Sequence, residues 1–305
     1  MNYHEFVRIV EKEINRNLEG GMKARLYTAI KNNSQKRIGI IVERPDVNVS
    51  PTIYLEEYYA QYHRGIEIGE ISKEILMFYE NVKCEKSWNE ELLDSYEKIN
   101  KKIVFKVVNT EKNKKFLDRV PHIDFLDLSI VFYVLLDANK NGTATMVIQN
   151  DNMEHWGISL QELLLTAIEN IKELLPPQLF TMKDIVEEIT DPFIQESANL
   201  LEKGLENNGE SMYILSNSLR SLGAACMVYP GMLKILGEIL GADYYLLPSS
   251  IHEVILVPKR EELHFQEMCN MVKEVNKEQV AAEEVLSDHA YFYSRKREKL
   301  LMEEC

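Results

Sequence analysis

Residues 244–258 read YYLLPSSIHEVILVP, and this stretch decides between the fold classes open to the chain. Two apolar runs, Tyr244–Leu247 and Glu253–Pro258, flank a short turn that begins with proline. Such runs predict two antiparallel strands of one sheet. Helical spacing of apolar residues predicts helices on either side, at 231–240 and 261–276. Because strands are joined both by tight turns and by helices, the pattern favours an α+β fold over a doubly wound sheet.

Further short strands are predicted in the C-terminal third, at 212–216, 224–229 and 290–293. The segment before them, Glu202–Glu210, is polar and contains glycine, a composition typical of linkers. We therefore expect two lobes, each a mostly antiparallel sheet with packed helices. The predicted parts are an N-terminal lobe at 1–176, a helical bridge and linker at 177–210, and a C-terminal lobe at 211–305.

The N-terminal lobe is predicted to mix helices with a hairpin. Apolar residues recur at helical spacing over 3–18, 69–82 and 159–174, which predicts three amphipathic helices. Two runs rich in β-forming residues, 25–31 and 37–43, are separated by a polar stretch and predict two paired strands.

Ser50 and Pro51 predict the start of another helix, with serine as N-cap and proline at the first helical position. Tyrosines recur every four residues from Tyr54 to Tyr62, which is typical of a half-buried packing stripe. Stacking of these rings on a base or a peptide remains the alternative. The apolar run 103–108 fits either a short strand or the end of a helix.

The dipeptide Asn141-Gly142 lies between two apolar runs and predicts a hairpin turn, because both residues tolerate positive φ. Together with Asp137 and Asn139 it also matches the first half of a calcium-binding loop. The twelfth position of such a loop requires a bidentate glutamate, and here it is Ile148. We therefore expect a hairpin without calcium.

Negative charge is concentrated in the middle of the chain. The net charge is −14, and residues 121–210 hold 4 Lys+Arg against 16 Asp+Glu, whereas residues 1–120 hold 21 against 19. Phosphate backbones are bound by Lys and Arg, so direct binding of nucleic acid is not expected. The acidic stretch is interpreted as a solvated face, with docking of a basic partner or mimicry of nucleic acid as alternatives.

The sequence shows neither a secretory signal pattern at its start nor an apolar run long enough to span a bilayer. Four cysteines, Cys84, Cys226, Cys269 and Cys305, are scattered without a close pair. We therefore expect reduced thiols, a cytoplasmic location and no contact with membranes. The oligomeric state stays open.

Phosphate-binding loops and paired Cys or His spacings do not occur in the sequence, so no cofactor and no metal are expected. The residues that could support nucleophilic catalysis are Cys226, His252 and Glu253, as nucleophile, base and orienting carboxylate. Cys226 lies within the apolar run AACMV, where a cysteine is typically a buried packing residue. The predicted catalytic set is therefore an alternative to plain core packing.

The turn at Pro248–Glu253 is the predicted binding site. Its residues Ser249, Ser250 and His252 should lie at the rim of the sheet, where scaffolds present binding groups. Tyr229, at the end of a neighbouring apolar run, is placed at the same edge. Short hydroxyls in turns also hydrogen-bond nearby backbone, so a structural role is the alternative.

Two C-terminal segments, GAACMVYPGMLKILGEILGADYYLLPSSIHEVILVP and MVKEVNKEQVAAEEVLSDHAYFYSR, resemble an uncharacterised bacterial family common in anaerobic Firmicutes, domain of unknown function 5688. PTIYLEEYYAQYHRG and MEHWGISLQELLLTAIENI also fit, so the resemblance covers nearly the whole chain. It implies a cytoplasmic bacterial protein and brings no catalytic residues.

The sequence thus predicts a non-enzymatic interaction or regulatory protein whose partner is another protein. Two alternatives remain open at this point. One is a cysteine-dependent hydrolase that uses Cys226, His252 and Glu253. The other is an acidic decoy of nucleic-acid-binding proteins, which requires the negative residues of 121–210 to form one surface.

Overall fold

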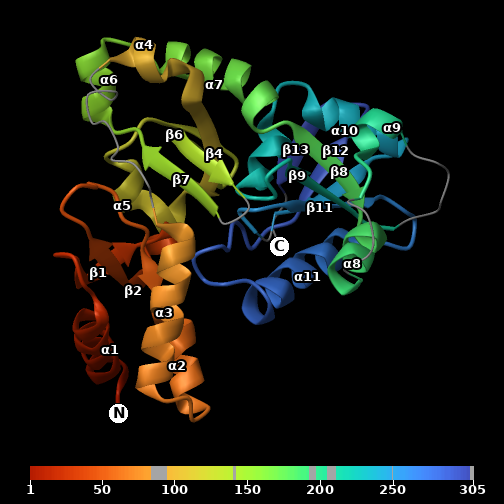
Figure 1. The fold of residues 1–305 in the computed structure, drawn as a ribbon. Coiled ribbons are helices and arrows are strands. Elements are labelled where there is room, and N and C mark those ends of the chain that lie inside the picture. The colour runs from red at the N-terminus through yellow and green to blue at the C-terminus, as the bar shows by residue number, and fades with distance from the viewer. Residues whose placement is uncertain (84–94, 140–141, 192–196, 205–210, 249, 303–305) are drawn as a thin grey trace. The chain divides into compact units, whose positions relative to one another are not determined.

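The computed structural model describes residues 1–305 except 84–94, 140–141, 192–196, 205–210, 249 and 303–305 (Figure 1). Helices pack on three mostly antiparallel sheets, which confirms the predicted α+β class. The chain forms two compact units, Met1–Leu92 and Leu93–Cys305. Residues 177–181, predicted as the start of a helical bridge, form a strand of the same sheet as Tyr213–Asn217.

The N-terminal unit is a three-stranded sheet with helices on one face (Figure 1). Helix α1 begins after a capping box in which Asn2 and Glu5 satisfy each other's backbone amides. Its apolar stripe packs with α3 and the sheet around Phe6, Ile40 and Ile71, which are fully buried. The elements are α1 (Tyr3–Asn17), β1 (Lys23–Ile30), β2 (Lys36–Glu43), β3 (Ile53–Tyr54), α2 (Glu56–His63) and α3 (Ile68–Val82).

The predicted helix start at Ser50 and Pro51 is wrong. The Ser50 hydroxyl accepts a hydrogen bond from the backbone N–H of Val42 at 3.0 Å instead of capping a helix. Ile53–Tyr54 forms β3, which pairs with β2, and the helix begins only at Glu56. Pairing with a strand distant in sequence therefore overrides the local capping signal.

The first sheet of the C-terminal unit has the order β4-β6-β5. Strand β5 pairs with the first residues of β6, and β7 pairs with the residues of β6 that follow them. The undecided run 103–108 is a strand, β4. Strands β6 and β7 are antiparallel, as the Asn141-Gly142 signal predicts, while Asn141 itself lies outside the described residues. The elements are α4 (Tyr96–Ile99), β4 (Ile103–Asn109), α5 (Lys114–Leu117), β5 (His122–Phe125), β6 (Leu128–Asn139), β7 (Gly142–Val147), α6 (Asn150–Trp156) and α7 (Leu160–Leu174).

The second sheet of this unit is antiparallel throughout, with the order β13-β12-β10-β11-β9-β8. The predicted pair of strands around Pro248 forms its centre as β10 and β11. The elements are β8 (Pro177–Thr181), α8 (Met182–Thr190), α9 (Leu200–Lys203), β9 (Tyr213–Asn217), α10 (Met232–Leu240), β10 (Tyr244–Leu247), β11 (Val254–Pro258), α11 (Phe265–Glu278), β12 (Tyr291–Ser294) and β13 (Lys299–Met302).

The predicted strand at 224–229 is wrong. Residues Gly223–Val228 form a 3-10 helix, η5, whose side chains are almost all buried. Strand β9 is paired with β11 on one side and β8 on the other, so the sheet has no free edge there for another strand. The apolar run is instead a buried helical turn that packs against β9.

Candidate functional site

The predicted nucleophile, Cys226, lies in η5 and is completely buried. Its thiol donates a hydrogen bond to the backbone carbonyl of Ser216 at 3.2 Å. Burial raises the pKa of Cys226 to about 12, and a hydrogen bond with Tyr229 opposes this only in part. The thiol is therefore protonated at neutral pH, whereas nucleophilic catalysis needs a thiolate. Cys226 is a free cysteine among the described residues.

The predicted base, His252, has both ring nitrogens directed at groups other than Cys226. Nδ1 accepts a hydrogen bond from the backbone N–H of Leu222 at 3.2 Å. Nε2 lies 3.5 Å from a carboxylate oxygen of Glu284. The third predicted member, Glu253, has its pKa raised by burial. The structure thus brings these residues into one region without giving Cys226 a base.

The predicted binding turn is mostly turned inward. The Ser250 hydroxyl is buried and accepts a hydrogen bond from the backbone N–H of His252 at 3.0 Å. Tyr229 is also buried, and its hydroxyl donates to the backbone carbonyl of Leu175 at 3.1 Å. Ser249 lies outside the described residues. The His252 and Glu284 side chains reach solvent, with 30% and 41% of their surfaces exposed.

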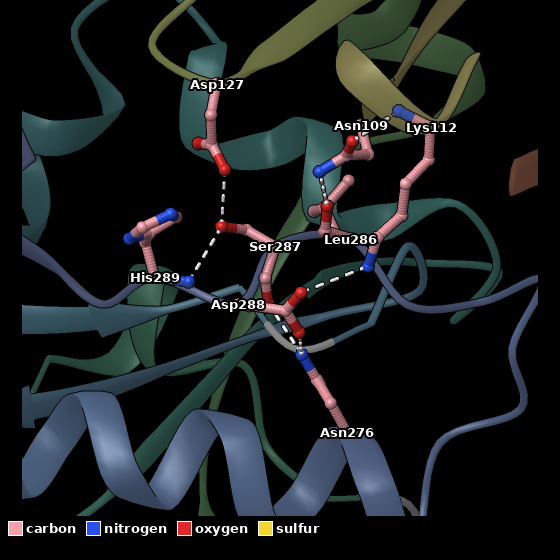
Figure 2. Close-up of polar contacts among 8 residues, drawn as sticks. All are labelled: Asn109, Lys112, Asp127, Asn276, Leu286, Ser287, Asp288 and His289. Atoms are coloured by element: carbon pink, nitrogen blue, oxygen red, sulfur yellow. Dashed lines mark hydrogen bonds and ion pairs between the residues drawn. The ribbon is translucent and has the colours of Figure 1, made fainter. Parts of the chain in front are cut away.

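A polar cluster next to this turn was not predicted from the sequence (Figure 2). At its centre is Asp127, from the turn between β5 and β6. Its carboxylate accepts hydrogen bonds from the Ser287 hydroxyl, at 2.6 Å, and from the Tyr291 hydroxyl. Burial and the neighbouring carboxylate raise the pKa of Tyr291 well above its ordinary value. The residue before Asp127, Leu126, has a φ of 57°, so the turn holds the carboxylate with a backbone conformation that is uncommon for leucine.

Helix α11 contributes a second part of the polar cluster. The Asn276 amide donates to the backbone carbonyl of Ser287 at 2.7 Å and to the Asp288 carboxylate at 2.8 Å. The Asp288 carboxylate also meets the ammonium of Lys112 at 3.2 Å. Burial alone would raise the pKa of Asp288, but the Asn276 and Lys112 contacts outweigh it and hold the pKa below its ordinary value.

The polar cluster joins segments from both sheets of the unit. The Asn109 amide, at the end of β4, donates to the backbone carbonyl of Leu286 at 3.0 Å. The backbone N–H of Ser287 donates to the carbonyl of Pro248, so the same loop also touches the predicted binding turn. The residues of the polar cluster are Asn109, Lys112, Asp127, Asn276, Leu286, Ser287, Asp288, His289 and Tyr291.

Most of the polar cluster's donors and acceptors satisfy one another. Two atoms are exceptions: Asn276 Oδ1 and His289 Nδ1 are buried and make no hydrogen bond. In Figure 2 the His289 side chain lies beside Ser287, whereas that of Asn276 lies below Asp288. Among the described residues, no three His, Cys, Asp or Glu side chains come together as a metal ion would need.

The fold and the polar cluster together define an α+β protein. Its buried polar groups mainly form hydrogen bonds between segments of the chain itself. The chain matches the model of the family of unknown function DUF5688 over residues 3–295, and it therefore belongs to that family, as the resemblance predicts. No curated protein and no solved structure matches the chain. None of the helices in the described ranges is both long and apolar enough to cross a membrane.

We expect replacement of His252 by alanine to lower the free energy of unfolding by about 1–2 kcal/mol, because the partly buried N–H of Leu222 loses its acceptor. Chemical denaturation monitored by circular dichroism measures this. His155→Ala, at an exposed position of α6, is the control and should leave the midpoint unchanged. If the midpoint of His252→Ala were also unchanged, the structural role of the ring would be contradicted, and His252 would be a binding group instead.

Proposed function

We propose that this chain is a non-enzymatic interaction protein of the bacterial cytoplasm and that its partner is another protein. The observation that carries the proposal is the state of Cys226. This thiol is fully buried, hydrogen-bonded to a backbone carbonyl and shifted to a pKa of about 12. A cysteine in that environment is a packing residue. The hydrolase alternative needs Cys226 as its nucleophile, so this environment counts against it.

The polar cluster supports the same proposal. Its hydroxyl, amide and carboxylate groups are engaged with one another, and the Ser287 side chain is completely buried. Buried polar networks of this kind rigidify a fold and specify one arrangement of its segments. A rigid scaffold of this sort suits the presentation of a surface to a partner.

The decoy alternative has less support than a protein partner. The acidic residues of 121–210 that the structure describes are distributed over strands β5 and β6 and helices α6, α7, α8 and α9. Within the C-terminal unit, α8 lies apart from α6 and α7 (Figure 1). Charge mimicry of a nucleic acid needs one continuous negative surface, and this arrangement divides it.

Thiol labelling separates the interaction protein from the hydrolase. The native chain is treated at neutral pH with a thiol-reactive probe, and labelling is quantified by mass spectrometry on the peptide that contains Cys226. We expect protection of this peptide in the native state and full labelling in denaturant, because exposure then requires unfolding. Labelling of native Cys226 within seconds would contradict the proposal and favour the enzyme.

The interaction itself is tested by affinity capture with the full chain as bait. A partner that binds the native chain but not the heat-unfolded chain supports the proposal. Turnover of a thioester or ester substrate by the wild type that is lost in Cys226→Ala would overturn it.

A further inference from the structure

The hairpin formed by β1 and β2 is basic in an otherwise acidic chain. Residues 23–44 hold six Lys+Arg and one Glu, whereas the whole chain has a net charge of −14. A local excess of this size creates a positive potential that steers acidic partners. The six cations are Lys23, Arg25, Lys31, Lys36, Arg37 and Arg44.

The strand register decides which side chains share a face. Ala24 is opposite Val42 and Leu26 is opposite Ile40, and this face packs on the helices as part of the N-terminal core. Side chains alternate along a strand, so the odd-numbered residues point the other way. The face away from the core therefore carries Arg25, Tyr27, Arg37, Ile41 and Tyr54.

This outward face contains a groove of about 620 Å³, a volume typical of binding pockets. Tyr27, Ile41 and Glu43 line it from the two strands, and Arg44, Val49 and Thr52 line it from the segment that follows β2. The Glu43 carboxylate is paired with the Arg25 guanidinium at 2.9 Å. Nearly half of the Tyr27 side chain is exposed, at 49%. The groove thus offers apolar side chains beside a carboxylate that Arg25 neutralises, in a hairpin with an excess of cations. This combination suits an apolar side chain carried by an acidic segment.

The edge of β1 is less suitable than this face for docking. On the free edge, the backbone N–H of Ala24 donates to Asn15 at 3.0 Å, and that of Leu26 donates to Glu11 at 3.1 Å. Side chains of α1 thus occupy the positions that an added strand would use at that end. Recognition through the outward face leaves these contacts intact.

Tyr54 distinguishes an acidic peptide from a nucleic acid as the occupant. Lys31 Nζ lies 4.2 Å from the centre of its ring, and the Arg37 guanidinium carbon lies 5.4 Å from it. Cation–π contacts of this kind hold the two cations close together above the sheet. The ring is therefore engaged by cations, whereas single-stranded nucleic acids are bound by aromatic rings left open for stacking.

We propose that the outward face of the β1–β2 hairpin binds an acidic, extended segment of a partner protein, with an apolar side chain of that segment in the Tyr27–Ile41 groove. Lys31 and Arg37 attract the carboxylates and the groove selects the apolar residue. This inference deepens the proposed interaction function by naming the partner's chemistry, and it rests on that function. Its test uses a binding readout that is independent of Cys226.

The experiment measures binding of the full chain to a fluorescein-labelled peptide of about twelve residues, mostly glutamate with leucine at two alternate positions. Fluorescence anisotropy is recorded at low and at physiological salt, together with a labelled oligouridylate of equal length. The variants are Lys31→Glu and Tyr27→Ala. Lys73→Glu, an exposed position of α3 in the same unit, is the matched charge-reversal control. Circular dichroism confirms that each variant is folded.

We expect the peptide to bind, with weaker affinity at higher salt because exposed charges are screened. Lys31→Glu and Tyr27→Ala should each weaken binding about tenfold, whereas Lys73→Glu should change it by less than about twofold. The inference would be overturned if Lys73→Glu lost as much affinity as Lys31→Glu, or if Lys31→Glu kept the wild-type affinity. Tighter binding of the oligouridylate than of the peptide would overturn it as well. Absence of peptide binding would overturn it too, while protection of Cys226 would still support the interaction function.

Discussion

Replacement of Gly223 by alanine is expected to lower the free energy of unfolding by about 3 kcal/mol, near the upper limit for overpacking a well-packed core. An added Cβ would lie 2.1 Å from the Ser216 hydroxyl, 2.6 Å from the carbonyl oxygen of His252 and 2.7 Å from the backbone nitrogen of Asn217. Two of these three atoms are backbone, so no side-chain rotation relieves the clash. Urea denaturation of the variant provides the measurement.

Gly69→Ala is the matched control for this prediction. Gly69 lies in the first turn of α3, and an added Cβ would meet no atom within 4 Å. Alanine is the better helix former, so this variant should be stabilised by at most about 1 kcal/mol. A midpoint for Gly223→Ala equal to that of the wild type would show that η5 does not pack against β9 as closely as described.

Asp127→Ala is the second substitution with a large expected effect. It removes the acceptor of two buried hydroxyls, those of Ser287 and Tyr291. Leaving such groups unsatisfied costs about 1–3 kcal/mol each, so a total loss of about 3 kcal/mol is expected. Thermal and urea denaturation measure the loss of stability, and near-ultraviolet circular dichroism measures whether the Tyr291 ring is packed less tightly.

Two further variants make the Asp127 result specific. Asp127→Asn retains a carbonyl acceptor and should lose less stability than Asp127→Ala. Glu169→Ala removes an exposed carboxylate from α7 and should stay within about 0.5 kcal/mol of the wild type. If Asp127→Ala were as stable as Glu169→Ala, the polar cluster would not hold the C-terminal loop in place.

The elements predicted correctly from the sequence are those whose signals are local. The helix predicted at 159–174 is α7, and its capping box involves Ser159 and Glu162, only three residues apart. The β6–β7 hairpin likewise follows from one dipeptide and its flanking runs. Patterns of this range are complete within a short window, so the surrounding fold does not need to be known.

The elements that were missed or wrong depend on partners distant in sequence. Ser50 bonds to β2 rather than capping a helix. The run after Leu222 cannot pair with β9, because β11 and β8 already occupy both sides of that strand. Strand β8 was overlooked because its short run follows a proline pair and depends on β9 for pairing. In each case tertiary contacts decide between conformations that the local sequence permits.

The candidate site depends even more strongly on residues that are distant in sequence. Residue type alone suggested Cys226, His252 and Glu253 as a set, but hydrogen-bond directions are fixed by the backbone around them. Asp127 and Ser287 are 160 positions apart, and no spacing rule connects them. Without a pattern linking such distant positions, the polar cluster could be found only in the folded structure.

The bond between Asp127 and Tyr291 has a consequence for synthesis of the chain. Its two ends lie 164 positions apart, and β12, which carries Tyr291, pairs in the sheet with β10 and β13. During translation the carboxylate is made long before its hydroxyl partners, so the C-terminal unit cannot close until nearly all of its residues have left the ribosome. The N-terminal unit has its whole core within its first 92 residues and can fold much earlier. A stalled or truncated chain ending before β12 should therefore present a folded N-terminal unit followed by an exposed, incomplete sheet, the form that proteases and chaperones recognise.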